Sequence, residues 1–220
     1  MKRLSLVGLG VAGPVAVAFL RLLLPYYRAA DDTATARLVV DHPGQQSAVL
    51  WLGLVATLTL VPGLYAARDA LPPGRLKSWS VGLTLVGYLC LPVVLVTDHL
   101  LWAAADLGLD PDETGRLVAS LHPTADIATG IFVLAHVVGT TLIGVLCLRR
   151  SVIPTSVAWA LTVSQPLHFV TTVLLGQAWI DLIAWSLTGI AMGFLAAIAH
   201  RPSSAPVPAR AAAVSARPSD

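Results

Sequence analysis

The chain has 220 residues, of which 56% are apolar and only 12% are charged, and its formal net charge is +2. A soluble domain normally carries about 25% charged residues, so the composition excludes an ordinary soluble protein and indicates an integral membrane protein in contact with a lipid bilayer. The small net charge argues against a nucleic-acid partner. The 12 Arg against 2 Lys, with many Ala, Val, Leu and Gly, are typical of a GC-rich bacterial genome.

Six apolar runs are long enough to cross about 30 Å of hydrocarbon as helices rising 1.5 Å per residue. The predicted spans are residues 4–24, 48–67, 79–105, 127–148, 152–175 and 180–199. They make residues 1–200 one all-α domain, a polytopic bundle of six transmembrane helices. Residues 201–220 are rich in Pro, Ala and Ser and lack apolar periodicity, which predicts a disordered cytoplasmic tail.

The basic residues predict the orientation of the bundle. Ten Lys and Arg lie on one set of span flanks, and only three, Arg28, Arg37 and Arg116, lie on the other. Because cytoplasmic flanks carry the excess of Lys and Arg, both termini are predicted to be cytoplasmic, in a bacterial cytoplasmic membrane.

The first predicted span contains Gly8-Leu9-Gly10-Val11-Ala12-Gly13, which has the spacing of a dinucleotide-binding fingerprint. That fingerprint needs a strand and a βαβ unit, whereas Pro14 and five further spans follow here, so we interpret the glycines as sites of close helix packing. The same region has features of a secretory signal peptide, but the apolar run resumes after Arg21, which favours an uncleaved span.

The two longer outer loops contain related sequences, DDTATARLVVDHP at 31–43 and DPDETGRLVASLHP at 110–123. In the second, Asp110 can cap a helix and Pro111 suits its first turn. Each loop is therefore predicted to form a short interfacial helix on the outer side of the membrane. The likeness indicates either a duplicated helical hairpin or two loops that converged on one geometry.

Arg37 and Arg116 occupy equivalent places in these two loops, against the charge bias that sets the orientation. One interpretation is that each forms a salt bridge with acidic residues of its own loop. The other is a basic pair at the outer mouth of the bundle that binds a carboxylate, a phosphate or lipid headgroups.

Ionisable residues inside spans are costly in a bilayer and are functional candidates by default. The six in this chain are Arg21, Asp98, His99, His136, His168 and Asp181. Measured from the span ends, all six fall in the outer half. Three polar neighbours on the same helix faces extend the set, namely Thr140, Ser164 and Gln165. Together they predict a buried polar pocket in the outer half of the bundle.

Several interpretations of this pocket remain open. The histidines could form interhelical hydrogen bonds that only specify packing, with Asp98 paired to Arg21 or a histidine. Asp98 could instead carry a proton or bind a cation in an outward-opening pathway, with the histidines as a relay. Two histidines could ligate haem, or Asp98, His136 and His168 could hold zinc, although no dense ligand spacing occurs. A hydrolase would need a nucleophile such as Ser164, which no motif supports, so no catalytic residue is predicted.

The function we predict is a small transporter or sensor-like protein that binds a small molecule or an ion in this pocket. The alternatives are a structural or accessory membrane subunit and a haem- or metal-binding redox subunit. We expect no enzyme activity and no cofactor in the first two cases. The stripe Gly189, Gly193 and Ala197 is typical of close helix contact, either within the bundle or in an oligomer.

Overall fold

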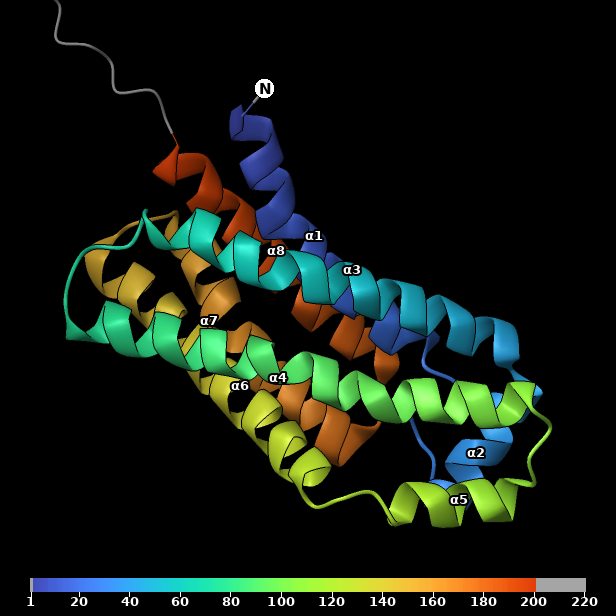
Figure 1. Cartoon of the computed structure of the whole chain (residues 1–220). Helices are drawn as coiled ribbons and strands as arrows, with labels where there is room; N and C mark the ends of the chain where they lie inside the picture. The colour runs from blue at the N-terminus through green and yellow to red at the C-terminus, as the bar shows by residue number, and fades with distance from the viewer. Residues whose placement is uncertain (1, 201–220) are drawn as a thin grey trace, which may run out of the picture.

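A computed structural model describes residues 2–200, which contain helices and no strand (Figure 1). The predicted all-α class is confirmed for this range, and the tail predicted at 201–220 lies outside it. The elements in chain order are α1 (Lys2–Leu23), α2 (Asp32–Asp41), α3 (Pro43–Arg68), α4 (Arg75–Asp106), α5 (Pro111–Ala119), α6 (Thr124–Arg150), α7 (Thr155–Val170), the π-helical turn η1 (Thr171–Leu175) and α8 (Ala178–Ala199).

Five helices, α1, α3, α4, α6 and α8, are long and apolar enough to cross a membrane, which indicates a membrane location. The region predicted as a further span at 152–175 folds differently. There α7 has 16 residues and passes directly into the five-residue turn η1, where the hydrogen-bonding pattern of the helix changes.

The six longer helices form a closed ring around the core. Neighbours in the ring are α1 and α3, α3 and α4, α4 and α6, α6 and α7, α7 and α8, and α8 and α1, and α3 also contacts α8 directly. Although α3 and α4 are both long, they pack against each other less extensively than either α1 with α3 or α4 with α6. The seam between α3 and α4 is therefore the loosest contact between two long neighbours in the ring.

Glycines allow α1 to approach its neighbours closely. A Cβ on Gly10 would lie 3.0 Å from a backbone oxygen of α8, and a Cβ on Gly13 would lie 2.9 Å from Leu60 of α3. Gly10 and Gly13 of the G-x-G-x-x-G sequence therefore serve helix packing, as predicted, whereas a Cβ on Gly8 would meet nothing within 4 Å. From the other side of this seam, a Cβ on Gly193 would lie 2.7 Å from Val11, so α1 occupies part of the glycine stripe of α8.

Both predicted loop helices are present, as α2 and α5, and they pack against each other at the end of the bundle opposite the N-terminus (Figure 1). Each has the expected aspartate cap, since Asp31 accepts from the backbone of α2 at 2.7 Å and Asp110 accepts from that of α5 at 2.8 Å. Their contact is close, because a Cβ on Gly115 would lie 2.9 Å from the backbone nitrogen of Thr33. The order long helix, short helix, long helix thus occurs twice, in α1–α3 and in α4–α6.

Candidate functional site

One polar cluster joins α1, α7 and α8 around Asp181, which is completely buried in the first turn of α8. The dipole of a helix favours a carboxylate at this position. Arg21 donates from Nε to Oδ2 at 2.8 Å, and His168 places Nδ1 2.5 Å from Oδ1. The hydroxyl of Tyr27 also donates to Oδ2, at 2.9 Å. Both carboxylate oxygens are therefore paired, and Arg21 and His168 pair with Asp181 rather than with Asp98.

The turn η1 adds a fifth side chain to this Asp181 cluster. Thr172 lies one turn after His168, with its Oγ1 3.3 Å from Arg21 Nη2 and 3.4 Å from Asp181 Oδ2. Just before, Pro166 has no N–H to offer the regular helical ladder. π-Helical turns are rare overall and frequent at functional sites, because they redirect side chains by a fraction of a turn.

A second polar cluster surrounds Asp98 on α4, which is 7% exposed. The Tyr26 hydroxyl donates to Oδ1, and Gln46 Nε2 donates to the same oxygen at 3.2 Å. Burial raises the pKa of the Tyr26 hydroxyl well above its usual value near 10, and the neighbouring carboxylate acts in the same direction, so Tyr26 remains a donor. Among the described residues, Asp98 has no ion-pair partner and its Oδ2 receives no hydrogen bond.

A cavity of about 270 Å³ lies between the two clusters, lined by α1, α4, α6 and the segment that follows α1. Its polar lining consists of Arg21, Tyr26, Thr97, Asp98 and Thr129, and the rest of the wall is aliphatic except for Phe132. The buried carboxylate of Asp98 and the guanidinium of Arg21 therefore face one largely apolar chamber. This volume is large enough for a small organic molecule.

His136 of α6 lies deeper in the core and is completely buried. Its Nδ1 contacts the carbonyl of Phe132, which can only accept, so Nδ1 carries the hydrogen. Nε2 is buried without a hydrogen-bond partner in the described part of the chain. Because an unpaired buried charge is very costly, the ring is neutral. It stacks on Trp185 at 5.3 Å and lies 5.6 Å from the ring of His168.

The other predicted core residues, Thr140, Ser164 and Gln165, are buried as well, and the Gln165 side chain adjoins His136. Ser164 Oγ lies 2.8 Å from Thr188 Oγ1, and Gln165 Nε2 donates to that same oxygen at 2.7 Å. Thr140 Oγ1 and Gln165 Oε1 are buried without hydrogen-bond partners in residues 2–200. These groups form a polar core connected to the Asp181 cluster through the neighbouring rings of His136 and His168.

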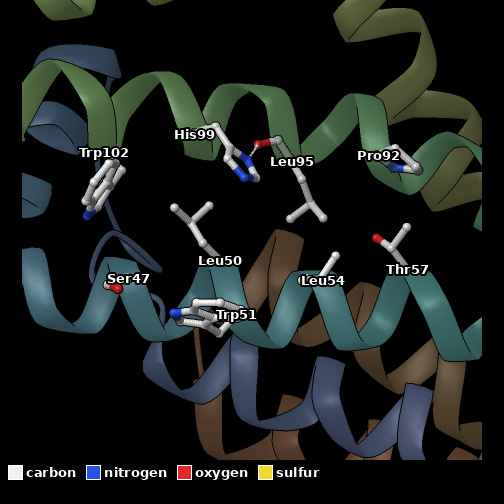
Figure 2. Close-up of a pocket in the computed structure, with 9 residues that line it drawn as sticks. All are labelled: Ser47, Leu50, Trp51, Leu54, Thr57, Pro92, Leu95, His99 and Trp102. Atoms are coloured by element: carbon white, nitrogen blue, oxygen red, sulfur yellow. Dashed lines mark hydrogen bonds between the residues drawn. The ribbon is translucent and has the colours of Figure 1, made fainter.

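His99 does not join the other histidines, although it follows Asp98 directly. Consecutive residues on a helix point about 100° apart, and His99 lies on the outside of the ring, in the groove between α3 and α4 (Figure 2). The three residues proposed from the sequence as zinc ligands, Asp98, His136 and His168, do not come together. His136 and His168 adjoin each other, whereas Asp98 accepts hydrogen bonds from Tyr26 and Gln46. No group of three or more potential metal ligands occurs within residues 2–200.

The arginines of the two loop helices, Arg37 and Arg116, are not equivalent in the structure. Arg37 of α2 forms an ion pair at 2.9 Å with Asp112 of α5, and both side chains are 62% exposed. The predicted salt bridge therefore joins the two loops instead of forming within one. Arg116 is exposed, and no ion pair with it is found in the described range.

Three participants were missed from the sequence. Tyr26 and Tyr27 have the pattern of aromatic anchors at a membrane interface, yet their hydroxyls bond to Asp98 and Asp181. Gln46 precedes the predicted span at 48–67, yet it is completely buried. A polar side chain within one turn of a span end was the available signal.

Comparison with known proteins finds no matching family model, no similar curated protein and no similar solved structure.

Proposed function

We propose that this protein is a small six-span transporter or sensor that binds an organic cation in the cavity between Arg21 and Asp98. The observation that carries the proposal is the state of Asp98, a buried carboxylate that faces a cavity without an ion-pair partner in the described residues. The guanidinium of Arg21 is already compensated by Asp181 at 2.8 Å. The uncompensated charge of the chamber is therefore that of Asp98.

Burying an ionised carboxylate without a counter-charge is expensive, and hydrogen bonds from Tyr26 and Gln46 offset only part of that cost. Two species can neutralise it, a proton on Oδ2 or a cationic ligand beside it. A ligand and a proton would then compete for one oxygen, which is the elementary coupling that a proton-linked transporter or a pH-responsive sensor requires. The apolar wall selects a cation with an apolar body over a hydrated metal ion.

The proposal includes the topology predicted from the charges, with cytoplasmic termini in a bacterial cytoplasmic membrane and α2 and α5 over the outer mouth. It requires α7 with η1 to form the sixth span. Maleimide labelling of single-cysteine variants in a Cys90→Ser, Cys147→Ser background tests both points. Cysteine at Ser151 should react from the cytoplasmic side, and cysteine at Gln177 from the outer side. Reaction of both from one side would refute the sixth span.

The ligand test uses purified protein in lipid nanodiscs and two probes of similar size and opposite charge, trimethylphenylammonium and benzoate. The cation should raise the unfolding temperature of the wild type, since a ligand at 100 times its Kd stabilises by about 2.7 kcal/mol. Asp98→Asn should abolish this increase, and Asp106→Asn, an exposed aspartate on the same helix, should retain it. Equal stabilisation by benzoate, or retention in Asp98→Asn, would contradict the assignment.

A structural or accessory subunit is the second candidate, and the Asp181 cluster favours it. Arg21, His168 and Tyr27 bond to both oxygens of one carboxylate, which joins α1, α7 and α8. Such a closed network specifies helix packing without needing a ligand. This candidate predicts that neither probe binds and that variants of Asp98 and His168 change stability alone.

A further inference from the structure

The loose seam between α3 and α4 contains a groove of about 490 Å³ (Figure 2). The groove and the Asp98 cavity lie on different faces of α4. Its wall is mostly apolar and opens outward, since Trp51 is 68% exposed and Leu54 is 47% exposed. In the topology proposed above, that outward face contacts lipid rather than water. The groove is therefore accessible to molecules dissolved in the bilayer.

The groove nevertheless contains hydrogen-bonding groups. His99 is exposed there, and its Nδ1 donates to the backbone carbonyl of Leu95 at 2.8 Å. With Nδ1 donating, Nε2 of the neutral ring is an acceptor that is free to bond within the groove. Further along, the hydroxyl of Thr57 is buried without a hydrogen-bond partner in the described residues. Figure 2 shows His99 on α4 across the groove from Trp51 and Leu54 on α3.

The lining also excludes several ligand classes. None of its residues is Lys, Arg, Asp or Glu, so a phosphate or carboxylate headgroup has no permanent counter-charge here. Trp102 lies one turn from His99 on α4, and Trp51 faces the groove from α3. Two indoles beside one acceptor suit an aromatic ring that carries a single donor.

We propose that this groove binds a membrane-dissolved phenol that carries an alkyl chain. The phenol hydroxyl donates to His99 Nε2, the ring lies against Trp51 and Trp102, and the chain extends along Leu54 and Leu95 toward Thr57. The site is separate from the organic-cation site, because His99 and Asp98 lie on different faces of α4 and only Leu95 lines both spaces.

Photoaffinity labelling in lipid nanodiscs tests the proposal. The probe is a 3-alkylphenol with a diazirine in its chain, and its methyl ether is the matched control that lacks the donor. The phenol should label peptides of α3 and α4, with apparent affinity about threefold to tenfold higher than that of the ether, as expected for one hydrogen bond. His99→Phe should remove this difference, and His99→Gln, which keeps an acceptor, should restore part of it.

The comparison of phenol with ether on the wild type needs no variant, so it stands even if His99→Phe fails to fold. Equal labelling by the two probes would show that the groove accepts apolar chains without recognising a hydroxyl, and would overturn the proposal. Labelling confined to other helices would overturn it as well. His122→Phe, which changes an exposed histidine outside the groove, should leave the phenol preference unchanged.

Discussion

The clearest prediction concerns the buried ion pair beside the proposed ligand cavity. Asp181→Asn preserves the shape of the side chain but removes its charge. The new amide nitrogen is a donor that would face other donors, since Arg21 and Tyr27 bond to Oδ2 and His168 bonds to Oδ1 in the wild type. The substitution therefore leaves a guanidinium that is only 20% exposed without its counter-charge.

The expected cost follows from this burial. Removing one partner of a buried ion pair typically destabilises by about 3 to 5 kcal/mol, because the remaining charge is uncompensated. In a chain of this size, 1 kcal/mol corresponds to a shift of about 2 to 4 °C in unfolding temperature, so Asp181→Asn should lower it by about 6 to 20 °C. Replacing both partners, in Arg21→Met with Asp181→Leu, should recover much of this loss, since no buried charge is left unpaired.

The assay is thermal unfolding of purified protein in one detergent, followed by tryptophan fluorescence. Arg21→Met and Asp181→Leu are also measured singly, so that the double variant completes a mutant cycle. The matched control is Arg37→Gln, which breaks an ion pair with both members 62% exposed and should cost less than about 1 kcal/mol. If Asp181→Asn unfolds within 1 °C of the wild type, or no more easily than Arg37→Gln, the Asp181 cluster does not stabilise the bundle as argued.

Three further predictions follow from other parts of the fold. Gly87→Ala should lower the free energy of unfolding, measured in denaturation assays, by about 1 to 3 kcal/mol, because the Cβ would lie 2.6 Å from the backbone nitrogen of His136. The control on the same helix is Gly82→Ala, whose Cβ meets nothing within 4 Å and which should be neutral or stabilising. Gly115→Ala should loosen the contact between α2 and α5, seen as faster amide hydrogen exchange in α2 with the long helices unchanged. Because the pKa of Tyr26 is raised in the folded state, its contribution to stability is complete below pH 10 and is lost as pH rises further. Between pH 9 and 11, the wild type should therefore lose more stability than Tyr26→Phe, by up to about 1.4 kcal/mol per pH unit.

Much of the helical structure could be predicted because it depends on local properties. The predicted span at 127–148 corresponds to α6, which runs from Thr124 to Arg150, and the aspartate before Pro111 caps α5 as expected. The errors lie at helix ends, since α3 begins at Pro43, five residues before the predicted span. Apolar length measures only the part of a helix that suits hydrocarbon, and a helix continues beyond it wherever its backbone remains hydrogen-bonded. No local pattern indicated η1.

The candidate site shows where sequence reasoning ends. Asp98 and Asp181 look alike in the sequence, as single aspartates in the outer parts of apolar runs. The structure gives Asp181 an arginine that is 160 positions away, and gives Asp98 only a hydroxyl and an amide. His99 was grouped with the other histidines by depth, yet it lies in the groove between α3 and α4 instead of in the core.

The sequence by itself determined that the chain is helical and suited to a membrane, and it located most of the helices, because apolar length and position along a helix are one-dimensional quantities. Only the tertiary structure decided which polar groups meet. That depends on the order of helices in the ring and on the rotation of each helix about its axis, which are set by glycine contacts such as Gly87 against α6 and Gly193 against α1. These contacts join residues far apart in the chain, so no local pattern records which carboxylate is paired and which faces a cavity.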